Sequence, residues 1–323
     1  MKSSKPIRFS LTRIGALFAL GAVLAVAIGS IPLSAQGGDS AIEQVLQILR
    51  DVEQNPPQHS LRSGGEAEPP GKIPTAGDFG RIVREDHAPK MILRGTSAGD
   101  SLFGRGGNDI IFGFGGPDRL AGNLGNDILV GGDGNDFIIG NNGVDFLYGE
   151  NGNDNLDGSN GGDFIHGGYG DDEIQALAAN DYVNCGPGDD NVNAGLGDDD
   201  VFGGPGDDFL WLRWGDDSVD GGEGDDTVHA AGGVNELVGG PGNDIFFYDI
   251  FDERDNDAVD TILDFKQGED KIRVNREISG TVKRSRVDGV RRTEFRIVDP
   301  TGQNVRDIIV IGVYVRRSDV EIC

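Results

Sequence analysis

The sequence predicts an all-β solenoid built from short repeats, and three observations support this fold class. An Asp recurs every nine residues from Asp100 to Asp244 without an insertion, at 16 of 17 positions, with Asn235 as the exception. Two residues after each position stands an apolar residue, from Leu102 to Phe246. Glycine fills 54 of 323 positions, more than twice its usual share of about 7%. The fixed period indicates a repeat architecture, and so much glycine excludes a mostly helical chain.

The net charge of the chain argues against some classes of binding partner. The chain carries a net charge of -27, which argues against nucleic acid and anionic lipid, because both bind cationic surfaces. Residues 95–248 hold 26 Asp and four Glu against three Arg, so this segment accounts for the whole net charge. Stacked carboxylates need counter-cations, and many flexible oxygen ligands suit Ca²⁺ better than Mg²⁺. The two Cys exclude a disulfide scaffold and a Cys-rich metal site.

Residues 1–35 are predicted to be a signal peptide. Basic residues at positions 2, 5, 8 and 13 precede an apolar run over 14–28, and Leu33-Ser34-Ala35 offers a small-residue cleavage site. The alternative is an uncleaved membrane anchor over 14–33, which is long enough to span a bilayer. Either interpretation places the rest of the chain outside the cytoplasm, in the periplasm, at the cell surface or in the medium.

A short amphipathic helix is predicted over 36–54 and a linker over 55–90. Ser40 and Glu43 form a capping box, and apolar residues follow at helical spacing on one face: Ile42, Val45, Leu46, Leu49 and Val52. Five of the 13 prolines fall between residues 55 and 80, a composition typical of a linker without a core.

Residues 91–248 are predicted to form the solenoid itself. In each repeat, six residues rich in Gly, Asn and Asp form a turn, and three form a short strand whose middle residue points inward. One repeat therefore buries a single side chain and is not stable alone. Stacked repeats bury a continuous ladder of apolar side chains.

The repeats resemble the hemolysin-type (RTX) calcium-binding nonapeptide family. The resemblance is clearest at residues 131–139, Gly-Gly-Asp-Gly-Asn-Asp-Phe-Ile-Ile, and at 203–211, Gly-Gly-Pro-Gly-Asp-Asp-Phe-Leu-Trp. It implies a parallel β-roll in which two nonapeptides make one turn. It also implies that several Ca²⁺ ions lie between loops 18 residues apart, bound by Asp carboxylates and loop carbonyls. The predicted ligands are Asp100, Asp109, Asp118, Asp127, Asp136, Asp145, Asp154, Asp163, Asp172, Asp190, Asp199, Asp208, Asp226 and Asp244.

The 18-residue spacing divides these loops into two rows. The first row contains Asp100 and every eighteenth residue to Asp244, and the second runs from Asp109 to Asn235. Three loops depart from the motif, over 176–181, 212–217 and 230–235, and all three fall in the second row. We therefore expect one nearly continuous calcium row and a second that fails beyond Asp163. A calcium count near the geometric maximum of about 15 ions, two rows of inter-loop spaces, would contradict this expectation.

Outward positions of four successive repeats carry an apolar set that predicts either a covered face or a docking surface. The face comprises Ile110, Phe112, Ile128, Val130, Phe146, Tyr148, Phe164 and His166. Left open it would be an unusually large patch, suited to a protein partner, a second copy or a hydrophobic substrate. Alternatively, the helix at 36–54 packs over it. If the helix covers it, deleting residues 36–60 should increase the fluorescence of a hydrophobic dye; unchanged fluorescence would favour docking.

Residues 249–323 are predicted to form a β-rich cap, because a solenoid needs its open end covered. The segment over 260–272 resembles the stretch that closes β-rolls in this family, and turns at 287–290 and 299–302 separate alternating strands. Cys185 and Cys323 could form a bridge, although two unreactive thiols are the simpler interpretation.

Motifs for catalysis are sparse. The chain has no His-Glu-x-x-His, and its four His are scattered. Residues 95–99, Gly-Thr-Ser-Ala-Gly, match the nucleophile elbow of hydrolases, but that motif requires a strand–turn–helix context. We therefore predict an exported, non-catalytic calcium-binding protein that folds when Ca²⁺ binds. The alternatives are a secreted hydrolase or cytolysin with the roll as an accessory, and a calcium-dependent adhesion or matrix protein.

Overall fold

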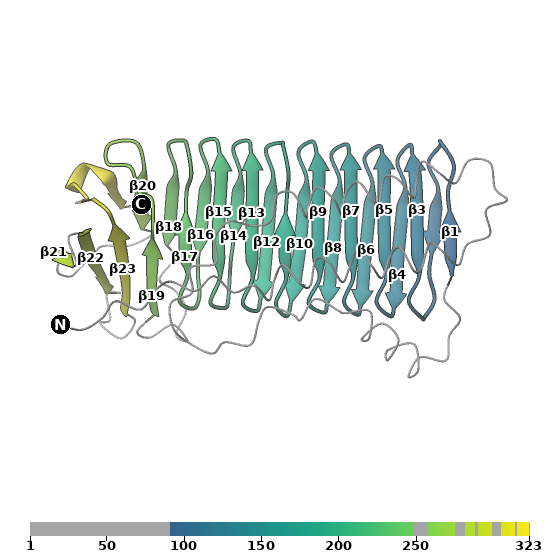
Figure 1. Cartoon of the computed structure of the whole chain (residues 1–323), viewed down its shortest axis with the longest axis horizontal. Coiled ribbons are helices and arrows are strands. Elements are labelled where there is room, and N and C mark those ends of the chain that lie inside the picture. Colours follow the sequence, from purple (N-terminus) through teal and green to yellow (C-terminus); the bar gives the residue numbers. More distant parts are fainter. Residues whose placement is uncertain are drawn as a thin grey trace, which may run out of the picture. The chain divides into compact units, whose positions relative to one another are not determined.

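The computed structural model describes residues 91–248, 258–274, 282–287, 290–298, 305–313 and 315–322. The predicted signal peptide, amphipathic helix and linker lie outside the described residues, as does Cys323. The described residues form a parallel solenoid of two β-sheets (Figure 1). This confirms the predicted all-β β-roll.

One sheet has 13 strands among the described residues, and its strands come from every other repeat. In spatial order they are β1 (Ile92–Arg94), β3 (Ile110–Gly115), β5 (Ile128–Asp133), β7 (Phe146–Asn151), β9 (Phe164–Tyr169), β11 (Tyr182–Asn184), β13 (Asp200–Pro205), β15 (Ser218–Glu223), β17 (Glu236–Val238), β19 (Ala258–Ile262), β23 (Val305–Ile311), β22 (Val290–Val298) and β21 (Val282–Val287). All neighbours are parallel except β21–β22 and β22–β23, which form an antiparallel meander at the C-terminal end.

The other sheet has 11 strands in the described part of the chain, from the remaining repeats. They are β2 (Ser101–Phe103), β4 (Arg119–Leu124), β6 (Phe137–Asn142), β8 (Asn155–Asn160), β10 (Glu173–Ala178), β12 (Asn191–Leu196), β14 (Phe209–Trp211), β16 (Thr227–Ala230), β18 (Ile245–Tyr248), β20 (Lys271–Val274) and β24 (Val320–Ile322). A single 3₁₀ turn, η1 (Arg317–Asp319), precedes β24. Within the described residues, no helix is long and apolar enough to cross a membrane.

The strand register equals two repeats. Ile111 pairs with Leu129, and Leu129 pairs with Leu147, so each residue stacks on the one 18 positions later. The apolar residue two places after each motif Asp points inward as predicted: these side chains are 0–3% exposed from Ile111 to Phe246, and Leu102 in the first turn is partly buried. Together they form the core of the roll.

Many strands are longer than the three residues predicted. Eleven of those in the repeat array span six residues, because pairing between turns continues through the glycine-rich positions, as between Phe114 and Gly132. The residue at this position adopts a left-handed conformation, with φ of 80° at Phe114 and 114° at Gly132. The backbone therefore bends there without losing its hydrogen bonds to the next turn.

The outward apolar set on β3, β5, β7 and β9 is not an open surface. Phe112, Val130, Phe146 and Tyr148 are only 4–9% exposed. Part of their contact is with each other along the sheet, since the rings of Phe146 and Phe164 stack at 4.8 Å. The helix predicted to cover this face lies outside the described residues.

Successive turns approach each other so closely at some glycines that a side chain there would clash, and substitution can test this. Gly134 has φ of 144°, and a Cβ there would lie 2.6 Å from the carbonyl oxygen of Gly116. Gly268 also has a positive φ, but no atom lies within 4 Å of its added Cβ. A positive φ costs alanine roughly 1–2 kcal/mol at either site, and only Gly134 adds a clash. We expect Gly134→Ala to reduce the free energy of unfolding more than Gly268→Ala in chemical denaturation with calcium present. Equal losses would contradict close packing of the turns.

Candidate metal-binding loops

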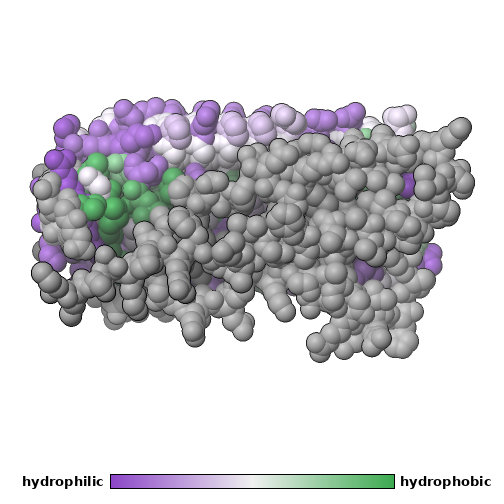
Figure 2. All heavy atoms as spheres, viewed as in Figure 1, coloured by the Kyte–Doolittle hydropathy of each residue, from purple (hydrophilic) through white to green (hydrophobic). Residues whose placement is uncertain are grey.

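The register gathers the motif Asp side chains into two rows, one at each end of the strands. Asp118, Asp136 and Asp154 succeed one another in the first row, and Asp127 and Asp145 do so in the second. From Asp109 to Asp244, every motif Asp is at most 4% exposed, and Asp100 in the first turn is half-buried. Hydrophilic residues line the visible edge of the roll along its length (Figure 2).

From Asp109 to Asp244, one carboxylate oxygen of each motif Asp holds neighbouring turns together. The backbone N–H of Asp118 donates to Oδ1 of Asp136 at 2.8 Å, and that of Asp136 donates to Oδ1 of Asp154 at 2.7 Å. The same bond recurs through both rows, from Met91–Asp109 to Asp226–Asp244. The Asp residues therefore have a structural role that the sequence interpretation missed, because the bond joins residues 18 apart.

The other carboxylate oxygen, Oδ2, is buried without a hydrogen bond in most loops. Among the described residues, Oδ2 has no hydrogen-bond partner in Asp118, Asp136, Asp145, Asp154, Asp163, Asp172, Asp181, Asp190, Asp199, Asp208, Asp217, Asp226 and Asp244. A buried polar atom left unsatisfied is costly. These loops therefore require a positively charged or hydrogen-donating group.

The space beside Oδ2 is small and lined by oxygen. A Cβ added to Gly131 would clash with Oδ2 of Asp136 and would lie 2.9 Å from the carbonyl oxygen of Gly149 in the next loop. The carboxylate of one loop and the carbonyl of the next thus border the same space. Acceptor oxygens from adjacent turns form a donor set that suits Ca²⁺.

Burial also opposes the charge that these carboxylates carry in water. It raises the pKa of Asp145 from its usual 3.8 to about 8, and that of Asp136 to about 6. By the same cause the pKa rises to about 7 at Asp154, Asp163, Asp172, Asp190, Asp199, Asp208, Asp226 and Asp244. A bound cation would restore the ionised form.

The loops at both ends of the rows are closed by protein donors. Asp100 Oδ2 accepts bonds from the backbone N–H (2.6 Å) and hydroxyl (2.9 Å) of Thr96, and Asp109 Oδ2 accepts one from Arg105 N–H at 3.3 Å. At the C-terminal side, Asp270 Oδ2 accepts one from Lys266 N–H at 2.6 Å. In the described structure, the thirteen Asp named above have no such donor to Oδ2.

Two Asp residues beyond the repeats, Asp260 and Asp270, continue the two rows. The sequence pattern did not assign them to these rows. Asp260 Oδ1 accepts from Asn235 N–H at 2.9 Å, and Asp270 Oδ1 accepts from Asp244 N–H at 3.3 Å. Each of these Asp stands two residues before a buried Ile, and this Asp-x-apolar pattern in the sequence could have identified them as members of the rows. It was hidden because the spacing here, 25 and 26 residues, breaks the nine-residue period.

Comparison with known families decides what these loops are. The RTX calcium-binding nonapeptide repeat (4 copies) matches residues 94–129, 121–156, 157–192, 179–210 and 211–246. Residues 94–246 of this chain are RTX nonapeptide repeats. Its repeats are calcium-binding repeats, and the buried Oδ2 atoms of the RTX roll fit that ion. In the described part of the roll, no three His, Cys, Asp or Glu side chains converge to hold a metal ion.

Two solved structures resemble the RTX roll. A subunit of the Azotobacter vinelandii mannuronan C5-epimerase matches with 20% identity and a TM-score of 0.20, over 46% of this chain and 78% of that one. The extracellular lipase LipA of Serratia marcescens matches with 14% identity and a TM-score of 0.18, over 73% of this chain and 40% of that one. A search of the curated proteins found no match.

Two reactive side chains considered in the sequence occupy structural positions. Ser97, in the sequence that resembles a nucleophile elbow, lies between strands β1 and β2, and neither neighbour is a helix. Cys185 is a free, fully buried thiol, and burial raises its pKa well above the usual value. The thiol therefore stays protonated and unreactive.

Proposed function

We propose that this RTX protein is exported and has a structural, non-catalytic role, and that its roll folds when calcium binds. The observation that carries the proposal is the series of buried Oδ2 atoms without hydrogen-bond partners among the described residues. Export is supported by the basic and apolar segments of residues 1–35, and it would expose the roll to the calcium outside the cytoplasm.

Calcium would be held between successive loops of a row. In the first row the carboxylates run from Asp118 to Asp244, and in the second Asp145 and Asp163 offer the same oxygen. The carbonyl of the following loop would supply a further ligand, as that of Gly149 does beside Asp136. The ion would neutralise desolvated carboxylates and fill the space that glycine leaves open.

Binding energy would then become folding energy. Without the ion, the roll must order a glycine-rich chain and bury stacked carboxylates, and both are unfavourable. A site absent from the unfolded chain couples binding to folding. Extracellular calcium modules typically have a Kd of about 10⁻⁴ to 10⁻³ M, so folding would respond to calcium outside the cell.

The test is a calcium titration of residues 36–323 followed by far-UV circular dichroism. We expect a transition from coil to strand near 1 mM calcium, on the order of the Kd of extracellular modules, with magnesium at the same concentration as the control. At neutral or alkaline pH, a chain already folded in chelator, or one folded equally well by magnesium, would contradict the proposal.

A further inference from the structure

The second row of loops changes character half-way along the roll. In its first four loops, the residue five places before the Asp is glycine: Gly104, Gly122, Gly140 and Gly158. A Cβ added at each would come closer than 3.0 Å to Oδ2 of that Asp, so the carboxylate occupies the place of a side chain. In the next four loops this place is taken by Ala176, Ala194, Leu212 and Ala230, all 0% exposed.

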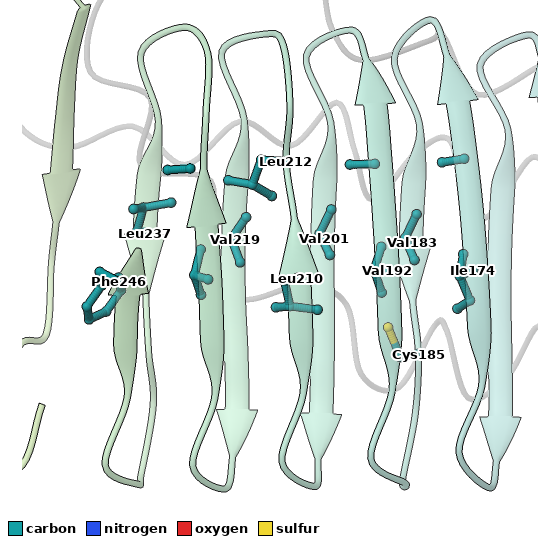
Figure 3. Packing of buried hydrophobic residues seen from close by; sticks show 14 of the residues in the cluster. Ile174, Val183, Cys185, Val192, Val201, Leu210, Leu212, Val219, Leu237 and Phe246 are labelled. Carbon is teal, nitrogen blue, oxygen red and sulfur yellow. The ribbon is translucent and has the colours of Figure 1, made fainter. Parts of the chain in front are cut away.

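These four side chains begin a second ladder inside the roll. They belong to the same core cluster as Tyr248 and Val274, and the register pairs Ala230 with Tyr248 and Tyr248 with Val274. Leu212 lies beside the central ladder toward the second row, whereas Cys185 lies toward the other (Figure 3). From Ala176 onward, an apolar side chain thus takes the place of the glycine of the earlier loops, while the carboxylates of Asp181, Asp199 and Asp217 stay buried.

In the last repeat of the second row, a nitrogen donor takes the place of the second carboxylate oxygen. Asn235 Oδ1 accepts from Asp217 N–H at 2.9 Å, as the aspartates do, but its Nδ2 donates to the carbonyl of Gly232 at 2.9 Å. An aspartate would place a second acceptor oxygen beside that carbonyl and would need a cation between them. The asparagine amide satisfies the carbonyl directly.

The first row ends in a comparable way. Nζ of Lys266 donates to the carbonyl of Gly240, and the neighbouring Asp264 carboxylate accepts from the backbone N–H groups of Gly239 (3.0 Å) and Gly240 (2.8 Å). A covalently attached ammonium therefore lies where the last loop of the row meets the segment that follows it.

We propose that the chain replaces calcium with its own groups at the C-terminal side of both rows. Lys266 closes the first row, while the ladder from Ala176 to Ala230 and the Asn235 amide close the second. Calcium then occupies the second row only up to Asp163, so Asp199 leaves the predicted ligand set. This inference rests on the proposed calcium-dependent folding, because it assigns which loops use the ion.

The decisive experiment compares one substitution at two places in the second row of the full chain. Asp145→Asn and Asp217→Asn both keep an Oδ1 acceptor and remove a charge. We expect Asp145→Asn to raise the calcium concentration at the folding midpoint at least threefold. Asp217→Asn should leave it unchanged or lower it, since a neutral amide is easier to bury. A rise with Asp217→Asn equal to that with Asp145→Asn would overturn the inference.

A second pair of variants tests the first row. Lys266→Met removes the ammonium beside Gly240 and should raise the calcium midpoint at least threefold. Lys271→Met is the control, because Lys271 Nζ contacts only the exposed Ser318 carbonyl at 2.8 Å in the described structure. Equal calcium midpoints for the two Lys variants would show that Lys266 does not replace calcium at the C-terminal side of the first row. Absence of any calcium transition in the wild type would instead overturn the proposed function.

Discussion

We expect the calcium-free roll to lose its strands as the pH rises from about 5 to about 8. Burial raises the pKa of Asp145 to about 8 and those of Asp154 and Asp163 to about 7, against an ordinary value of 3.8. The folded state therefore binds more protons than the unfolded state between these values. The stability that protonation supplies is complete below the ordinary pKa and is lost as the pH rises through 7 to 8.

This loss of strand structure with rising pH is the largest effect that we expect for the protein. Burial raises the pKa of eight motif Asp to about 7, and each of them loses its proton in the folded state as the pH rises. A typical domain is stabilised by only ~5–15 kcal/mol, so charging several buried carboxylates together is enough to unfold the roll. At neutral pH we therefore expect the folded roll to depend on calcium to neutralise these carboxylates.

Far-UV circular dichroism in chelator, recorded between about pH 4.5 and pH 8.5, measures this loss. Calcium-saturated protein is the control, and its signal should stay constant because the ion keeps the carboxylates charged in the folded state. Strand content in chelator that is as high at pH 8 as at pH 5 would contradict the prediction. It would mean that protein groups, rather than protons or calcium, compensate the buried carboxylates.

Truncation of the central ladder gives the second large effect. Leu147 is 0% exposed and pairs with Leu129 before it and Ile165 after it, so Leu147→Ala opens a cavity between turns. Leu→Ala changes in a core cost about 2–5 kcal/mol. We expect a loss of that size in the free energy of unfolding by urea at saturating calcium. The proposed coupling of folding to calcium binding predicts a higher calcium midpoint as well.

The matched control for this truncation is Leu124→Ala. Leu124 is 56% exposed at the end of β4, so the same chemical change should cost less than about 0.5 kcal/mol, as surface substitutions usually do. Similar losses for the two variants would show that the ladder is not the core of the roll.

The sequence predicted the repeat region well because its period is local and strict. An apolar residue two places after each Asp indicated the inward direction, and the structure buries those side chains from Ile111 to Phe246. It could not indicate that strands continue through the glycine-rich positions, because pairing there depends on the preceding turn. The sequence also could not indicate that Phe112 and Phe146 are buried, because their outward positions do not show what covers them.

What the sequence determined by itself is therefore the periodic part: the all-β solenoid, its 18-residue turn, its inward ladder and two rows of acidic loops. Only the tertiary structure decided how each Asp is used. Oδ1 bonds the neighbouring turn and Oδ2 is left without a hydrogen bond in most loops, while Asn235 and Lys266 supply donors of their own. The physical reason is distance along the chain. Apart from the local bond of Asn235 to Gly232, these contacts join residues 18 or more positions apart, where a local pattern specifies the residue type but not its partner.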